Sequence, residues 1–177
     1  SLPDEVTDAA GRGDEAALLA WLDRSGQINA TDGASGITAL MLSAQGGHER
    51  VVELLLQRGA EIDLQDGDGG TALMLATSSG HEREIDLLLK HGAEIDMQNN
   101  RGVAVLMLAA SSGCERVVEL LLQRGADINL QSRDGGTALM YAAVFDHPAV
   151  VLRLLRAGAD TKLRSVNGKS ALQLAKE

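Results

Sequence analysis

One apolar pattern returns along the chain at a constant interval. A five-residue segment that reads Thr-Ala-Leu-Met-Leu in its first copy comes back, with small changes, at one fixed spacing. The copies begin at Thr38, Thr71, Ala104, Thr137 and Ser170. Farther along each unit, residues 49–65 and 115–131 differ at only two positions. The pattern therefore predicts a protein built from stacked copies of one structural unit.

Each unit predicts two short helices followed by a loop. Thr38 is suited to cap a first helix, and the Gly46-Gly47 pair ends that helix. Glu49 suits the N-terminus of a second helix, whose apolar residues keep a helical spacing until Gly59. The polar residues 61–70, rich in glycine and aspartate, predict a turn-forming arm that leads to the next unit. Because helices this short are marginal alone, we expect them to stack.

The repeated unit resembles that of the ankyrin-repeat family. That family follows the pattern D-x-x-G-x-T-P-L-H-x-A-A, then G-H, V-V-x-L-L-L and G-A-D-x-N. In one unit the matching stretches are residues 66–76, Gly80-His81, residues 87–89 and residues 92–96. The family's proline is Ala or Val here, and its histidine is Met41, Met74, Met107 or Met140. The resemblance implies an all-α fold, an ankyrin-repeat α-solenoid of stacked antiparallel helix pairs with protruding β-hairpin-like arms and a concave binding face.

The repeat also predicts how the chain is divided. Residues 1–177 are expected to form a single ankyrin-repeat domain. Its units cover about 1–31, 32–65, 66–98, 99–131 and 132–164, and a partial unit covers 165–177. The first unit is more polar than the inner ones, as expected of a cap that faces water. Because the partial unit holds only a first helix, we expect the chain either to be cut from a larger protein or to be capped by something else.

Composition narrows the class of protein. With 45% hydrophobic but only 2% aromatic residues, the core must be aliphatic, and an aromatic-rich β-sandwich is disfavoured. A net charge of −9 argues against a nucleic-acid-binding surface. No apolar stretch approaches the ~20 residues that a membrane-spanning helix needs. The single cysteine, Cys114, cannot form an internal disulfide, so we expect an intracellular protein of the cytoplasm or nucleus.

The residues that could suggest a catalytic or metal-binding site lack the spacing that such a site requires. His48, His81, His147 and Cys114 occupy one position in successive units, so they would lie too far apart to share a zinc ion. The aspartates around Asp66 lack the spacing and the final glutamate of a calcium loop. No phosphate-binding glycine motif is present, and no base accompanies the cysteine. The sequence predicts no enzyme activity, no cofactor and no metal.

The residues that do not repeat are the candidates for partner recognition, because stacking accounts for those that do. In the resembled family, partner contacts come from the arms and from the ends of the first helices. The predicted partner-binding residues are Asp68, Arg101, Val103, Ser111, Ser112, Arg133, Met140, Val144 and Phe145. Phe145, Arg101 and Arg133 are the expected anchors, since aromatic and arginine side chains dominate interface hot spots. The methionine that recurs once per unit either fills the core or lines a groove.

Three functions are compatible with these patterns. The first is a noncatalytic module that binds a protein or peptide on its concave face. The second is a regulatory or assembly segment of a larger multidomain enzyme, channel or scaffold. The third is an engineered repeat-protein binder, which the near-identical second helices suggest. All three predict a protein or peptide partner, with no nucleic acid, no membrane insertion and no metal.

Overall fold

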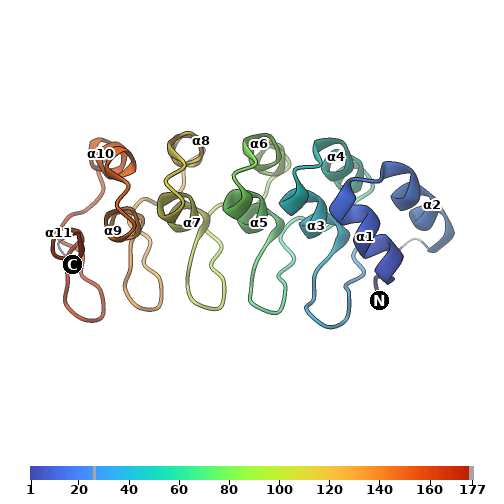
Figure 1. Cartoon of the computed structure of the whole chain (residues 1–177), viewed down its shortest axis with the longest axis horizontal. Helices are drawn as coiled ribbons and strands as arrows, with labels where there is room; N and C mark the ends of the chain where they lie inside the picture. Colours follow the sequence, from blue (N-terminus) through green and yellow to red (C-terminus); the bar gives the residue numbers. More distant parts are fainter. Residues whose placement is uncertain (26, 176–177) are drawn as a thin grey trace. The chain divides into compact units, whose positions relative to one another are not determined.

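The chain folds into short α-helices joined by turns and loops. The computed structural model describes residues 1–25 and 27–175 (Figure 1). The helices in this part of the chain are α1 (Asp4–Arg12), α2 (Glu15–Ser25), α3 (Ala39–Gly46), α4 (Glu49–Gln57), α5 (Ala72–Ser79), α6 (Glu82–Lys90), α7 (Val105–Ser111), α8 (Glu115–Gln123), α9 (Ala138–Val144), α10 (Pro148–Arg156) and α11 (Ala171–Leu174). Over the same residues there is no strand, and an isolated antiparallel bridge joins Thr31 to Thr38. The all-α class predicted from the sequence is therefore confirmed.

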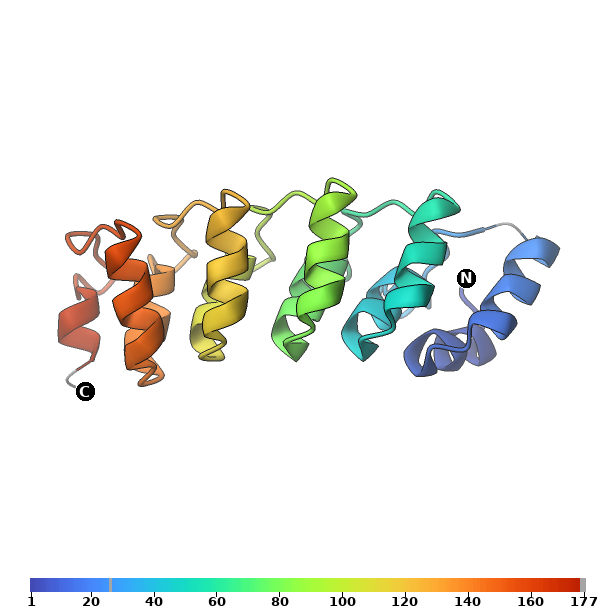
Figure 2. The ribbon, with the colours of Figure 1, turned by 90° about the horizontal axis from the view of Figure 1, so that it is seen from above.

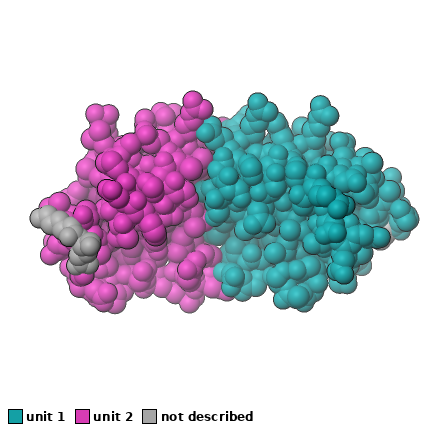
Figure 3. Space-filling model, in the orientation of Figure 1, with its two compact units in different colours: residues 1–94 teal, residues 95–177 magenta. Residues whose placement is uncertain are grey.

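The helices belong to two compact units, Ser1–Glu94 and Ile95–Glu177 (Figure 3). In the first unit, α1 packs on α2, α3 on α4, and α5 on α6, while α3 lies between α1 and α5. In the second unit, α7 packs on α8 and α9 on α10, while α9 contacts both α7 and α11. The repeat boundaries given above stay predictions.

Each compact unit is layered in the same way. The first helices of the repeats lie near the arms, and the second helices lie on the opposite side (Figure 1). Viewed from above, the second helices of a unit run side by side in the same direction (Figure 2). The apolar stripe of the second helices faces inward, since Leu55, Leu88, Leu121 and Leu154 are each fully buried. Stacking therefore supplies the stability that the short helices lack.

The recurring threonine caps the first helices, as predicted. The hydroxyl oxygens of Thr38, Thr71 and Thr137 each accept a hydrogen bond, 3.3 Å long, from the backbone N–H three residues later. Ala104 has nearly the same backbone angles, φ −102° and ψ 167°, against −103° and 165° for Thr137. It has no hydroxyl to offer, so its helix starts without a side-chain cap.

The recurring methionines belong to the core. Their side chains are nearly inaccessible to solvent, with exposures of 1% for Met41, 3% for Met74, 1% for Met107 and 3% for Met140. Between the two alternatives that the sequence left open, the structure thus favours core packing. Flexible thioether side chains suit this position because they fill irregular gaps between stacked repeats.

The arms are tight turns. One backbone hydrogen bond closes the turn in each of the five arms, for example from Asp66 N to the carbonyl oxygen of Gly70 and from Asn99 N to that of Val103. In the second unit, the repeats thus present their arms and first helices on one side, and this side holds most of the predicted partner-binding residues.

Candidate functional site

Backbone hydrogen bonds join successive arms of the second unit. The amide of Arg133 donates to the carbonyl oxygen of Arg101 at 3.0 Å, and the amide of Val166 donates to that of Asp134 at 2.8 Å. Gly102 permits this close approach, because its φ is +73° and a Cβ there would lie 2.7 Å from the nitrogen of Arg133. The three arms therefore hold their exposed side chains in a fixed register.

Side chains also stiffen each arm from within. The Oδ1 atom of Asn99 accepts from the amides of Arg101 and Val103, at 2.9 and 3.0 Å. In the next arm, the hydroxyl oxygen of the buried Ser132 accepts from Gly136 N at 3.0 Å. The two arms carry Arg101 and Arg133 at their tips, so both arginines project from ordered turns.

Two adjacent hollows lie along these arms. The smaller one has a volume of about 320 Å³. Its lining residues are Asn100, Arg101, Val103, Arg133, Asp134 and Tyr141. The larger one, about 790 Å³, extends from the same arm over α9 to the last arm. We call the two hollows together the arm groove.

Most of the predicted partner-binding residues line the arm groove. The smaller hollow holds Arg101 and Val103, the larger one holds Met140, Val144 and Phe145, and Arg133 lines both. Residues from two arms and from α9 are thus brought to one surface. The structure places this surface within a single compact unit.

The exposed members of this group combine positive charge with apolar surface. Val144 and Phe145 are 53% and 54% exposed, which is unusual for large apolar side chains. Arg101 and Arg133 are also exposed, and neither forms an ion pair with another described residue. The groove therefore offers free guanidinium groups beside an aromatic ring.

Val103 and Met140 are placed differently from their neighbours in the groove. They are only 6% and 3% exposed, so their side chains form its inner wall and anchor the core beneath it. The burial of both side chains follows from the stacking of α7 and α9. The sequence did not indicate the burial of Val103, because the residue at this position varies from repeat to repeat.

Three predicted residues lie outside the arm groove. The hydroxyls of Ser111 and Ser112 both donate to the carbonyl oxygen of Leu108, at 2.8 and 2.9 Å, and neither residue lines the groove. Asp68 is exposed in an arm of the first unit, where its amide donates to Asp66 Oδ1 at 3.0 Å.

Tyr141 is a groove residue that the predicted set missed. It lines both hollows, and a Cβ on Gly136 would lie 2.9 Å from its ring. The signal was present in the sequence, because Tyr141 stands where other repeats have Leu42, Leu75 and Leu108. The glycine at position 136 makes room for the larger ring.

Histidine, cysteine, aspartate and glutamate form no group of three that could hold a metal ion among residues 1–25 and 27–175. The ring nitrogens Nε2 of His48 and His81 instead donate to single carbonyl oxygens, those of Gly11 and Gln45, at 2.8 and 3.0 Å. Within this part of the chain, no helix has the length and apolar character needed to cross a membrane.

Helix pairs that recur at a fixed interval and are joined by turn-forming arms define a helical repeat protein of the solenoid class. The family model described as ankyrin repeats in three copies matches residues 7–99, 40–132 and 106–177. These matches cover nearly the whole chain, and the chain belongs to the ankyrin-repeat family. Ankyrin repeats are generally protein–protein interaction modules, and the family is typically noncatalytic.

Proposed function

We propose that this chain is a noncatalytic interaction module that binds a peptide or a folded protein on the concave, arm-bearing side of its second unit. The observation that carries the proposal is the arm groove, where Arg101, Arg133 and Phe145 are exposed beside a preformed hollow. Ordered aromatic and arginine side chains lose little entropy on binding and dominate interface energetics.

The groove also limits the chemistry of the partner. Arg101, Arg133 and Lys169 surround it, against the single carboxylate of Asp134, whose Oδ1 already accepts from the hydroxyl of Ser132 at 2.5 Å. The second unit holds ten basic and eight acidic side chains, whereas the first holds six basic and seventeen acidic. A segment with carboxylates next to an apolar side chain fits this surface best, because its charges would meet free guanidinium groups.

The same proposal assigns Ser111 and Ser112 to the margin of the partner contact in the second unit. Asp68 lies in the first unit and is proposed as a partner-binding residue of that unit alone. Val103 and Met140 form the inner wall of the arm groove and maintain its shape. We also propose an intracellular location, in the cytoplasm or nucleus, because Cys114 is the single cysteine and is free.

The test uses a partner captured on the immobilised chain and then purified. Titration calorimetry would compare the wild-type chain with Phe145→Ala and Arg101→Ala. Each substitution should weaken binding by about 2 kcal/mol or more, as truncation of a hot-spot residue does. The matched control is Arg156→Ala, which removes an exposed arginine from α10, outside the arm groove.

Circular dichroism would check that the variants keep the wild-type helix content and thermal midpoint. The proposal fails if Phe145→Ala and Arg101→Ala bind the partner as tightly as wild type while Arg156→Ala does not. Raising the salt concentration should slow association with the wild-type chain, because exposed charges are screened beyond about 8 to 10 Å at physiological ionic strength.

A further inference from the structure

The smaller hollow of the arm groove is lined by two arginines that come from successive arms. Arg101 and Arg133 are both exposed, and neither forms an ion pair with another described residue. The backbone hydrogen bond from Arg133 N to the carbonyl oxygen of Arg101, 3.0 Å long, holds the two residues side by side. Two positive charges are thus kept next to each other on ordered turns of the protein.

This pair of arginines departs from the repeat. Arg101 stands where the preceding and following repeats have Asp68 and Asp134. Position 133 is uncharged in the other arms of the same length, where it is Gly67, Asn100 or Val166. Each of these arms is nevertheless closed by the same backbone hydrogen bond. The fold of the arms therefore does not require an arginine at either position.

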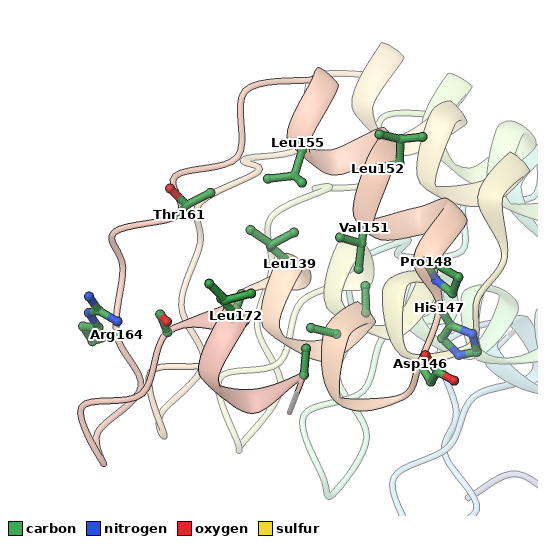
Figure 4. A pocket seen from close by; sticks show the side chains of 15 residues that line it. Leu139, Asp146, His147, Pro148, Val151, Leu152, Leu155, Thr161, Arg164 and Leu172 are labelled. Atoms are coloured by element: carbon green, nitrogen blue, oxygen red, sulfur yellow. The ribbon is translucent and has the colours of Figure 1, made fainter. Parts of the chain in front are cut away.

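Other hollows of the second unit hold their arginines differently. Arg153 pairs with Glu119 at 3.2 Å, and both line a hollow of about 470 Å³ between α8 and α10. Along α10 and α11, Arg164 lines an apolar hollow beside side chains such as Leu139 (Figure 4). Arg164 also donates to Oε1 of Gln173 at 3.0 Å. Among these hollows, the smaller hollow of the arm groove is thus the one with two unpaired guanidinium groups.

Two adjacent guanidinium groups match a phosphoryl group better than a carboxylate. One arginine satisfies both oxygens of a carboxylate through two parallel hydrogen bonds, and the carboxylate brings one negative charge. A phosphoryl group on a side chain has three acceptor oxygens and a charge of about −1.5 to −2 at neutral pH. It is therefore able to accept from both arginines and to balance both charges. Tyr141 lines the same hollow and carries a further donor, its hydroxyl.

The acid in the lining of the smaller hollow, Asp134, does not neutralise the arginines. Its Oδ1 accepts from the hydroxyl of Ser132 at 2.5 Å, and it forms no ion pair with a described residue. Two arginines and one aspartate leave the lining with an excess of one positive charge. Because electrostatic attraction grows in proportion to the charge of the incoming anion, this excess favours a phosphoryl group over a carboxylate.

We propose that the smaller hollow binds the phosphoryl group of a phosphorylated side chain in the partner segment, with Arg101 and Arg133 as its hydrogen-bond donors. This inference rests on the proposed function of the arm groove, and it adds that phosphorylation of the partner switches binding on. The larger hollow adjoins the smaller one at Arg133 and Tyr141. An apolar side chain close to the phosphorylated residue would therefore lie against the exposed Phe145.

The test uses fluorescein-labelled peptide pools with degenerate flanks around a fixed centre, which is phosphoserine, a pair of glutamates or serine. The phosphoserine and double-glutamate centres carry about the same charge, so comparing them isolates the geometry of the phosphoryl group. Fluorescence anisotropy with the full chain should show the phosphoserine pool binding at least about tenfold more tightly than the double-glutamate pool. Inorganic phosphate should compete only at concentrations far above the Kd of the phosphoserine pool, because it makes no contact with Phe145.

Arg101→Asp is the decisive variant, because it restores the acid of the neighbouring repeats and alters an exposed side chain. It should weaken the phosphoserine pool by more than about tenfold. Arg133→Lys keeps the charge but loses the paired donors, so it should weaken the phosphoserine pool about tenfold and change the double-glutamate pool little. Arg156→Lys, on α10 and outside the smaller hollow, is the matched control and should change neither.

Three results would overturn the phosphoryl site. They are equal affinity for the phosphoserine and double-glutamate pools, no binding of the phosphoserine pool, and wild-type affinity of Arg101→Asp for the phosphoserine pool. Inorganic phosphate that binds as tightly as the phosphoserine pool would show that the site takes the free ion, and would overturn the assignment to a partner segment.

The captured and purified partner separates this inference from the proposed function. Phosphatase treatment of the partner should lower its affinity for the wild-type chain at least about tenfold. A treated partner that binds as tightly as before, but still loses affinity for Phe145→Ala, would overturn the phosphoryl site and leave the proposed function intact. A partner that neither Phe145→Ala nor Arg101→Ala weakens would instead overturn the proposed function, whatever the peptide pools show.

Discussion

The Nε2 atom of His147 lies 2.9 Å from the carbonyl oxygen of Ser111, thirty-six residues earlier in the chain. A carbonyl oxygen only accepts, so the imidazole N–H is the donor. The bond satisfies one of the carbonyls left free at the end of α7 and ties it to the start of α10. Gly113 allows the ring to sit there, because any side chain at that position would collide with it. His48 and His81 make the equivalent bond in the first unit, so it is a recurring link between neighbouring repeats.

Replacing His147 by alanine should lower the free energy of unfolding by about 1 to 2 kcal/mol, since a half-buried carbonyl oxygen loses its donor. Urea unfolding followed by circular dichroism measures the change. His91→Ala is the control, because His91 is exposed and its ring makes no hydrogen bond to a described residue. Equal midpoints for the two variants would show that the bond to Ser111 contributes nothing.

Ala104→Thr should raise the free energy of unfolding by about 0.5 to 2 kcal/mol, because the backbone at Ala104 already has the angles of the capped repeats. The added hydroxyl would accept from the amide of Met107. Ala104→Val is the matched control, since valine fills the same space without the hydroxyl. The difference between the threonine and valine midpoints in urea isolates the cap, and a valine variant as stable as the threonine variant would contradict it.

Glu84 is buried at a position where three other repeats have valine. Its side chain is 4% exposed, against 1–2% for Val51, Val117 and Val150, and it has no hydrogen bond or ion pair to a described residue. The Glu84 carboxylate oxygens are not among the fully buried, unpartnered side-chain atoms of the described residues, so they keep contact with water. Glu84→Val should raise the free energy of unfolding by about 1 kcal/mol, because it places more apolar surface at a position that is apolar in three other repeats. Part of the gain is offset, since a glutamate in the first turn of a helix is favourable. Thermal unfolding would compare Glu84→Val with the control Glu82→Gln, which measures the effect of a first-turn charge at an exposed position. A midpoint of Glu84→Val below that of the wild type would disprove the predicted stabilisation.

The pKa of Asp32 lies below the usual value of an aspartate, chiefly because the hydroxyl of Ser35 donates to its carboxylate. Desolvation opposes this shift, and the backbone amides of Ser35, Ile37 and Gly36 lower the pKa further. The hydrogen bonds stabilise the charged form, so their contribution to folding is present above the ordinary pKa and is lost as the pH falls through the lowered one.

Ser35→Ala should move the pKa of Asp32 upward, toward the ordinary value. Titration of the carboxyl carbon by NMR in wild type and variant measures the shift directly. Asp68, another exposed aspartate of an arm, serves as the reference group in the same spectra. An unchanged pKa of Asp32 in Ser35→Ala would show that the backbone amides alone are responsible.

Local signals were enough to predict the helices of this protein. Thr38 caps α3, Gly47 ends it with a φ of +73°, and Glu49 begins α4, as the sequence predicted. These outcomes follow from interactions over three or four residues, which the order of side chains specifies directly. The constant period of the apolar pattern likewise predicted the all-α repeat fold, because one helix pair cannot bury its apolar face alone.

The arm groove could not be predicted from local sequence signals alone. The anchors Arg101, Arg133 and Phe145 were named because they vary between repeats, but only packing shows that Arg133 and Tyr141 line both hollows. The same packing buries Val103 among the residues expected to touch a partner.

The sequence by itself determined where the helices start and stop and how often the unit repeats, because capping, glycine and apolar spacing act within one turn or one helix face. Tertiary structure decided which side chains are free to bind. The reason is that residues of different repeats come together only through tertiary contacts. Examples are the backbone hydrogen bond from Arg133 to Arg101 and the stacking of α7 and α9. Exposure is a property of those contacts, and no single repeat contains them.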